Sequence, residues 1–231
     1  MKKNTFISVL AFVLLPLLIT ASCNPKKLPD GNSVETVKDI DGNIYHTVKI
    51  GTQIWMVENL KTTKYNDGTE IPLVTDYSIW AALLTPAYCW YSNDATTYKN
   101  RYGALYNWAA VSTAKLAPIG WHVPNEADWT TVTTYLGGET VAGGKLKEAG
   151  TLNWTKPNAF ATNQTNFSAL PGGYRLYNGT FDSVGENGFW WSSTESDWRC
   201  AESLWMTYNY GASVGNSISK QSGFSVRCVK D

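Results

Sequence analysis

Hydrophobic and polar residues alternate from Val34 onward, with the two-residue period of a half-buried β-strand. The alternation is interrupted at Asp41-Gly42, a dipeptide that favours the positive φ of a hairpin turn, and again at Gly51-Thr52. The pattern therefore predicts a β-meander of three strands over residues 34–60.

A helical period is clearest over residues 125–136. Asn125 is a suitable N-cap, because its side chain can accept a hydrogen bond from the first free backbone N–H groups. Trp129, Val132 and Leu136 fall on one face of such a helix, and two glycines follow it. These signals predict one amphipathic helix that packs against a core.

Shorter patterns predict the remaining elements. They are short helices at 77–84 and 141–149, a strand at 87–91, a short helix or buried strand at 103–111, and strands at 174–177, 189–192, 203–208 and 223–229. Few helices, many short strands and long connections indicate the α+β class. Tryptophans in the connections, such as Trp154 and Trp198, indicate that these loops are ordered.

The first residues indicate export from the cytoplasm. Two lysines precede an apolar run over residues 6–19, which small residues close, as in a secretory signal. Cys23 follows the small residues directly, so the segment resembles the lipobox of bacterial lipoproteins. That resemblance implies removal of residues 1–22 and lipidation of Cys23, with palmitate among the acyl chains. An ordinary secreted protein and a short anchor helix are the alternatives.

The organisation that follows is a signal peptide at 1–22, a flexible tether at 23–33 and one domain at 34–231. The tether is rich in Pro, Gly and charge and poor in aliphatic residues. The lipid would hold the protein at a membrane of the bacterial envelope. We expect the outer membrane rather than the inner one.

Composition narrows the classes further. The chain has 19 Lys and Arg against 19 Asp and Glu, together with 11 Trp, 13 Tyr and 7 Phe. This excludes a disordered chain, which would be strongly charged and poor in aromatics. It also excludes a coiled coil. We expect no nucleic-acid partner, since such binders carry a basic balance or patch.

Several segments in a fixed order resemble one family. They are IGTQIWMVENL (50–60), YGALYNW (102–108), PIGWHVPNEADW (118–129), GGKLKE (143–148), FSALPGGYR (167–175), GFWWSSTE (188–195) and GFSVRCVKD (223–231). Together they resemble the Fibrobacter succinogenes major paralogous domain, a family of bacterial envelope proteins that are often lipoproteins. The resemblance supplies no biochemical activity.

A wider similarity concerns the fold. HVPNEADW and the closing GFSVRCV are similar to segments of formylglycine-generating enzymes. That similarity implies a C-type-lectin-like fold, with paired N- and C-terminal strands and long loops that carry the binding surface. The redox cysteine pair of those enzymes has no counterpart over residues 205–220, so their oxidase activity is not transferred.

The family resemblance also bears on the cysteines. Relatives carry Cys-Pro before the G-W-H segment, where this chain has Ala117, so one partner of a family disulfide is missing. A Cys200–Cys228 disulfide is the favoured substitute. Cys89–Cys228 is a second pairing, and three buried thiols are the third alternative.

No catalytic constellation is recognisable, so we do not expect an enzyme. His46 and His122 are the only histidines and are interpreted as structural, and no G-x-S-x-G elbow is present. We also expect no cofactor. The Asp39–Asn43 stretch begins like a calcium loop, but Ile50 stands where the closing Glu belongs, and a hairpin turn explains it better. A structural Ca²⁺ is the alternative.

Trp190 and Trp191 are the candidate ligand-binding residues. Neighbours in a strand face opposite ways, so one indole is expected in the core and the other in a cleft that binds a glycan. The plainer alternative is a core on both sides that buries both. Arg175 and Arg227 are interpreted as structural partners of carbonyls or acids.

These observations predict non-catalytic binding of a glycan or a protein at the cell envelope. An enzyme acting on envelope or dietary polysaccharide is one alternative. A structural adhesin or assembly component is another.

Overall fold

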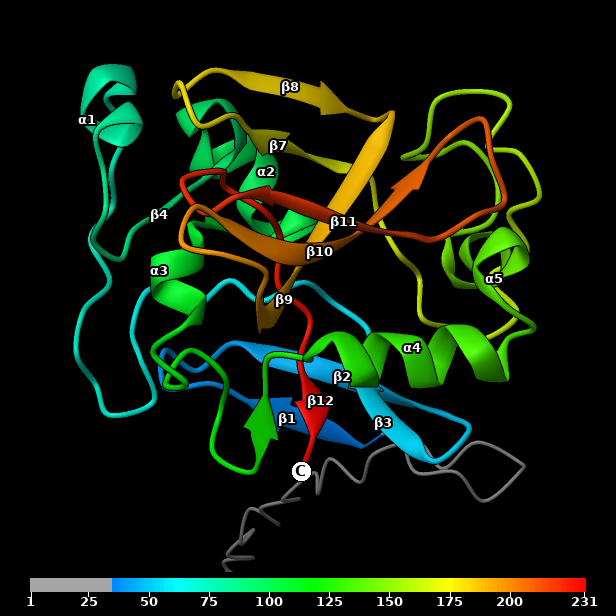
Figure 1. Ribbon diagram of the computed structural model, residues 1–231. Coiled ribbons are helices and arrows are strands. Elements are labelled where there is room, and N and C mark those ends of the chain that lie inside the picture. The colour runs from blue at the N-terminus through cyan, green and yellow to red at the C-terminus, as the bar shows by residue number, and fades with distance from the viewer. Residues whose placement is uncertain (1–34) are drawn as a thin grey trace, which may run out of the picture. The chain divides into compact units, whose positions relative to one another are not determined.

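The computed structural model describes residues 35–231 (Figure 1). The predicted signal peptide, tether and lipidation site at Cys23 lie outside the described residues.

The first sheet begins with the predicted meander. β1 (Thr36–Lys38) pairs antiparallel with β2 (Ile44–Ile50), and β2 pairs with β3 (Gln53–Met56). Gly42 takes a φ of +85°, which the hairpin needs and glycine adopts without steric cost. The Asp39 carboxylate accepts from the backbone N–H of Asn43 at 2.9 Å and so fixes the turn. The hydrogen bond and the glycine of this turn fix which residues of β1 and β2 are paired.

The end of the chain completes this sheet. β12 (Val229–Lys230) pairs antiparallel with β3 on one side and with β6 (Trp121–His122) on the other. The strand order is β1-β2-β3-β12-β6. In Figure 1 the red end of the chain accordingly lies beside the blue strands. Of the predicted strand at 223–229, only Val229 belongs to a regular strand, and residues 223–225 form isolated bridges instead.

The second sheet comes from the last third of the chain. Its order is β11-β10-β9-β7-β8. The strands are β7 (Gly172–Arg175), β8 (Phe181–Val184), β9 (Asn187–Glu195), β10 (Cys200–Thr207) and β11 (Val214–Ser219). β9 and β10 contain the predicted apolar strands, whereas β8 and the mostly polar β11 were not predicted. A bulge separates the pairs Trp191–Ser203 and Glu195–Ala201.

The amphipathic helix is confirmed as α4 (Glu126–Tyr135). Asn125 is its N-cap, and its side chain accepts from the backbone N–H of Asp128 at 3.0 Å. In return, the backbone N–H of Asn125 donates to the Asp128 carboxylate at 3.0 Å, which completes a capping box. Trp129 and Val132 are buried, as the pattern predicts.

The other elements are short. They are α1 (Tyr77–Ala81), β4 (Tyr88–Cys89), a 3₁₀ turn (Tyr91–Asn93), α2 (Ala95–Tyr102), β5 (Leu105–Tyr106), α3 (Trp108–Val111) and α5 (Glu139–Leu146). The ambiguous segment 103–111 is thus a strand followed by a helix. α2 was not predicted, since its polar sequence lacks an apolar stripe. The structure confirms the α+β class.

The core lies on both faces of β9. Trp191 packs with Phe224 on one face, with ring centroids 4.5 Å apart. Trp190 belongs to a second cluster that holds Trp55 and Trp129. Both indoles of the pair are fully buried. The expectation that one of them faces a loop or cleft is therefore wrong, and the alternative of a two-sided core that buries both is confirmed, because β9 is a central strand covered on both sides.

Arg227 is a fully buried cation that main-chain oxygens surround. Its guanidinium donates to the carbonyls of Phe167 at 2.5 Å and Ser168 at 3.1 Å, and to the Asn59 side chain at 2.9 Å. It also lies 4.3 Å from the ring centroid of Phe167. Since burial opposes its charge, the pKa of Arg227 falls to about 9. Arg227 thus ties three distant segments together through hydrogen bonds, as its structural interpretation requires.

Lys147 plays the same part at the start of the long connection from α5 to β7. Its ammonium is fully buried and donates to the carbonyls of Ala159, Thr207 and Tyr210 at 2.8 to 2.9 Å. Burial lowers the pKa of Lys147 to about 8. The Lys147 ammonium therefore ties the connection, through the carbonyl of Ala159, to the carbonyls of Thr207 and Tyr210.

We predict that Arg227→Met lowers the free energy of unfolding by at least about 3 kcal/mol, because it leaves several buried acceptors without a donor. Urea unfolding of both proteins measures the difference. Arg199→Met is the matched control, since Arg199 is exposed and its replacement should change stability by less than about 0.5 kcal/mol. Equal stability of the two variants would contradict the structural role of Arg227.

Candidate functional site

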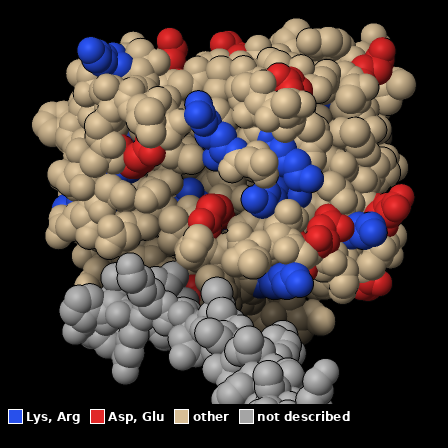
Figure 2. All heavy atoms as spheres, turned by 180° about the vertical axis from the view of Figure 1, so that it is seen from behind, with Lys and Arg blue, Asp and Glu red and all other residues tan. Residues whose placement is uncertain are grey.

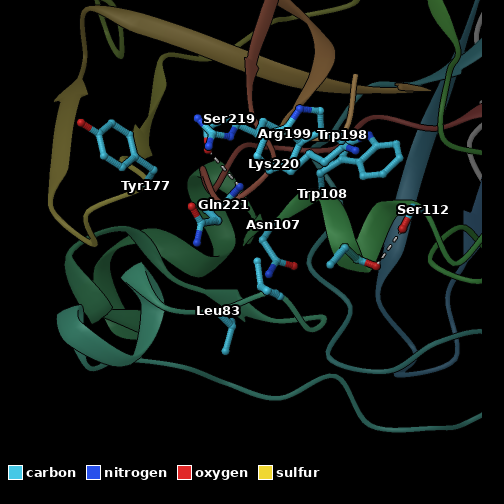
Figure 3. A pocket seen from close by; sticks show the side chains of 12 residues that line it. Leu83, Asn107, Trp108, Ser112, Tyr177, Trp198, Arg199, Ser219, Lys220 and Gln221 are labelled. Atoms are coloured by element: carbon cyan, nitrogen blue, oxygen red, sulfur yellow. Dashed lines mark hydrogen bonds between the residues drawn. The ribbon is translucent and has the colours of Figure 1, made fainter. Parts of the chain in front are cut away.

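An open cleft of about 780 Å³ is formed by segments that are far apart in the sequence. Figure 3 shows Trp108, Trp198, Arg199 and Lys220 gathered on one side of it, with Tyr177 and Leu83 elsewhere on its rim. These residues come from the end of α1, the start of α3, and the turns that follow β7, β9 and β11. Tertiary structure alone brings them together.

Trp198 is the most exposed indole of the cleft. It keeps 76 % of its surface accessible, although the guanidinium of Arg199 stacks 4.0 Å from its ring centroid. The turn that carries the pair is held by Asp197, whose carboxylate accepts from the backbone N–H groups of Arg199 at 2.7 Å and Cys200 at 2.8 Å. These bonds lower the pKa of Asp197. The exposed indole therefore stands on a fixed turn.

Trp108 and Lys220 form a second stacked pair beside the first. Trp108 opens α3, and its indole N–H donates to the carbonyl of Ser192 at 3.0 Å. The ammonium of Lys220 lies 4.7 Å from the Trp108 ring centroid and forms an ion pair with Glu195. This indole is half-buried and anchored to the bulge of β9.

Arg175 fixes the opposite wall of the cleft. It is fully buried, and its guanidinium donates to the carbonyls of Gly179 at 2.8 Å and Val74 at 2.6 Å. One contact holds the turn that carries the exposed Tyr177, and the other holds the start of the α1 segment. Gly179 has a φ of +90°, and a Cβ there would lie 2.4 Å from the carbonyl oxygen of Tyr77. No other residue fits this approach.

Trp80 links the α1 segment to the far side of the cleft. Its ring centroid lies 4.3 Å from the Arg175 guanidinium, and its indole N–H donates to the carbonyl of Gln221 at 2.8 Å. The Gln221 side chain returns a bond to the carbonyl of Ala81 at 3.0 Å. The cleft walls are therefore preformed by the fold.

The cleft offers contacts rather than acid–base chemistry. Within residues 35–231, its lining contains two cations, aromatic rings, hydroxyls and amides, and no Asp, Glu, His or Cys. In the same part of the chain, no group of three or more His, Cys, Asp or Glu could hold a metal ion. The carboxylate of Asp39, considered above for calcium, is engaged by the Tyr45 hydroxyl at 2.6 Å and by Asn43.

The face opposite to the view of Figure 1 carries charged side chains of both signs. Figure 2 shows Lys and Arg side chains gathered near the middle of that face, with acidic side chains around them. Most of the surface drawn is uncharged.

Trp190 and Trp191 do not line the cleft. Their indole N–H groups donate inside the core, to the Asn59 side chain at 2.8 Å and to the carbonyl of Tyr106 at 2.7 Å. Their proposed ligand-binding role is therefore corrected. The exposed indole that sequence reasoning missed is that of Trp198, which lines the cleft. Its signal was a tryptophan in a polar turn, Ser196-Asp197-Trp198-Arg199, with no apolar neighbour to pack against.

The favoured Cys200–Cys228 disulfide is not formed in this structure. Cys89, Cys200 and Cys228 are all free thiols. Cys200 opens β10 in the second sheet, whereas Cys228 is fully buried in the first sheet, where its carbonyl accepts from Met56 at 3.0 Å. Burial raises the pKa of the Cys228 thiol, and that of Cys89 to about 12. Both buried thiols behave as small apolar side chains.

His122 joins strand β6 to two acidic groups away from the cleft. Its ring nitrogens lie 2.7 Å from an Asp231 carboxylate oxygen and 3.1 Å from one of Asp128. Partial burial opposes its charge, but the bonds with Asp231 and Asp128 outweigh it and raise the pKa. His46 contacts Glu58 at 2.6 Å on the surface. Neither histidine faces a lining residue of the cleft.

The fold and site define an α+β domain with a preformed aromatic cleft. Residues 48–230 match the model of the Fibrobacter succinogenes major domain. The chain belongs to this family, as the motifs indicated. No curated protein and no solved structure matches the chain. Among residues 35–231, no helix has the length and apolar character needed to cross a bilayer.

We predict that His122→Ala destabilises the domain more at about pH 5.5 than at about pH 9. The pKa of His122 is raised in the folded state, so its contribution is fully present below the unfolded value and is lost as the pH rises through the folded one. Because the side chain is 40 % exposed, the effect stays below about 1 kcal/mol. Thermal unfolding of both proteins at the two pH values measures it. An equal loss of stability at the two pH values would contradict the pairing of His122 with Asp231 and Asp128.

Proposed function

We propose that this protein is a lipid-anchored protein of the bacterial envelope whose domain binds a glycan without catalysis. The observation that carries the proposal is Trp198, which stands 76 % exposed in an open cleft with preformed walls. An exposed indole on a fixed turn buries little apolar surface and so contributes little to folding. It is suited to a ligand that covers it.

A glycan fits the chemistry of this cleft. One face of a sugar ring presents C–H groups, and these pack on the electron-rich face of an indole. The hydroxyls around the ring need hydrogen-bond partners, which the side chains of Ser219 and Gln221 can supply at the cleft. Few polar groups set into an aromatic lining are typical of ligand sites.

Binding is favoured over hydrolysis by the same lining. Glycosidases use a pair of carboxyl groups on either side of the scissile bond. No Asp or Glu lines the cleft within the described residues. An enzyme acting on envelope or dietary polysaccharide is the alternative, and release of sugars from a bound glycan would establish it.

The finer fold assignment is part of this proposal. We infer a C-type-lectin-like arrangement, and the antiparallel pairing of β12 with β3 supports it. The long connection from α5 to β7, pinned from below by Lys147, supports it too. In such a fold the loops present the ligand surface, and the cleft is built largely from loops and turns.

The anchor places the domain in the envelope. The lipobox resemblance implies a mature chain that begins at Cys23, with residues 23–33 as the tether and the outer membrane as the favoured location. Lipoprotein members are frequent in the family that the chain resembles. A short tether would keep the cleft close to the membrane and to the glycans there.

A structural adhesin or assembly component is the second candidate. It is favoured by a separate groove of about 580 Å³ beside Phe160 and Tyr210, which are 77 % and 62 % exposed. Exposed apolar surface of this kind is also typical of protein contacts.

We predict that the purified full chain binds members of a panel of neutral and acidic polysaccharides, and that Trp198→Ala weakens the binding at least about tenfold through loss of stacking. Affinity electrophoresis measures it. Tyr135→Ala is the matched control, because Tyr135 is an exposed aromatic outside the cleft. Absence of binding to every polysaccharide, or equal effects of the two variants, would contradict the proposal.

We also predict that cells expressing the full chain incorporate a clickable palmitate analogue into it, and that Cys23→Ala abolishes this labelling. The readout is fluorescence of the immunoprecipitated protein. Cys200→Ala is the control, since it removes a thiol of the domain. Unlabelled wild-type protein, or unchanged labelling of the Cys23 variant, would contradict the anchor.

A further inference from the structure

We infer that the cleft selects acidic glycans, whose sugars carry carboxylate groups. This rests on the proposed glycan binding and names the class of ligand. The chain as a whole is balanced, with 19 basic and 19 acidic residues. The charged residues that line the cleft, Arg199 and Lys220, are both cations. Within the described residues, the lining of the cleft thus carries charged side chains of positive sign only, although the chain as a whole has no net charge.

The acids nearest in sequence are already occupied. Glu195 pairs with the ammonium of Lys220, and that lysine side chain is only 19 % exposed. Asp197 accepts two backbone N–H groups within its own turn. Neither carboxylate is a lining group. Lys220 is therefore largely neutralised, and Asp197 serves the turn.

Arg199 remains as the cation without a partner. Within residues 35–231 its guanidinium makes no hydrogen bond and no ion pair, and its contact is the ring of Trp198 at 4.0 Å. Stacking covers a face of the guanidinium and leaves its N–H edge available. That edge matches a carboxylate with two parallel hydrogen bonds.

Trp198 and Arg199 together fit a single uronic acid residue. Such a sugar has an apolar ring face, and its carboxylate is attached to a carbon of the same ring. The indole face that Arg199 leaves free can take the apolar face of the sugar, while the N–H edge of the guanidinium takes the charge. A neutral sugar in the same place would leave that edge without an anionic partner. The Trp198–Arg199 pair therefore favours a uronic acid over the corresponding neutral sugar.

The test compares uronic acid polymers with their own carboxyl-reduced forms, which keep the linkage and lose the charge. Polygalacturonate, alginate and hyaluronan are each used in both forms with the purified full chain, by isothermal titration calorimetry. We expect at least one polymer to bind about tenfold or more tightly as the acid. Raising the salt from about 50 to about 500 mM should weaken the acid form and leave the reduced form unchanged.

Two variants test whether Arg199 causes the preference for the acid polymer. Arg199→Gln should bring the affinity for the acid polymer down to that for its reduced form, whereas Arg101→Gln, at an exposed position on α2 outside the cleft, should not. Equal binding of acid and reduced forms, binding confined to neutral glycans, or an acid preference that survives Arg199→Gln would overturn the inference and leave glycan binding intact. Failure of every glycan, charged or neutral, would overturn the proposed function as well.

Discussion

Buried cations held by main-chain carbonyls are the constraint on which the rest of this structure depends. Lys147, Arg175 and Arg227 are each fully buried. An unsolvated charge in a protein interior is very unfavourable, so each must be surrounded by acceptors. Many of the acceptors are carbonyls of irregular segments, such as those of Ala159, Gly179 and Phe167, and others lie at the ends of β3 and β10. The long loops are ordered because the cations require them to be.

The same constraint carries through to the site. Arg175 is bonded to the turn at Gly179 and to the segment before α1, and those two pieces provide one wall of the cleft. Trp80, stacked on Arg175, connects that wall to Gln221 on the other side. The cleft is thus built on groups that cannot move without exposing a buried charge. Preformed walls lower the entropy lost on binding a ligand.

The elements that could be predicted are those set by local chemistry. The Asp41-Gly42 turn fixes the first hairpin, and Asn125 with Asp128 fixes the start of α4, since both depend on residues a few positions apart. The polar helix α2 lacks an apolar stripe and could not be recognised. The structural roles of Arg175 and Arg227 were expected from the sequence, but their partners were not, because these lie up to 171 positions away.

The site itself could not be predicted from the sequence. Trp190 and Trp191 were the conspicuous pair, yet the second cluster of the core covers the face that was expected to be open. Whether a strand is central or lies at an edge follows from the order β11-β10-β9-β7-β8, which no local pattern encodes. Trp198 became a candidate once its exposure was known. Abundant aromatic residues in this chain mainly build a core, and the cleft uses only a few of them.

The central claim is that the ligand site is the cleft around Trp198 and not the buried pair. It is tested most directly by indole N–H resonances in ¹⁵N NMR spectra, assigned by substitution, during titration with a bound glycan. The account predicts that the resonances of Trp198 and Trp108 shift with ligand concentration, while those of Trp190 and Trp191 stay in place. Shifts at the buried pair, or at no indole of the cleft, would contradict it.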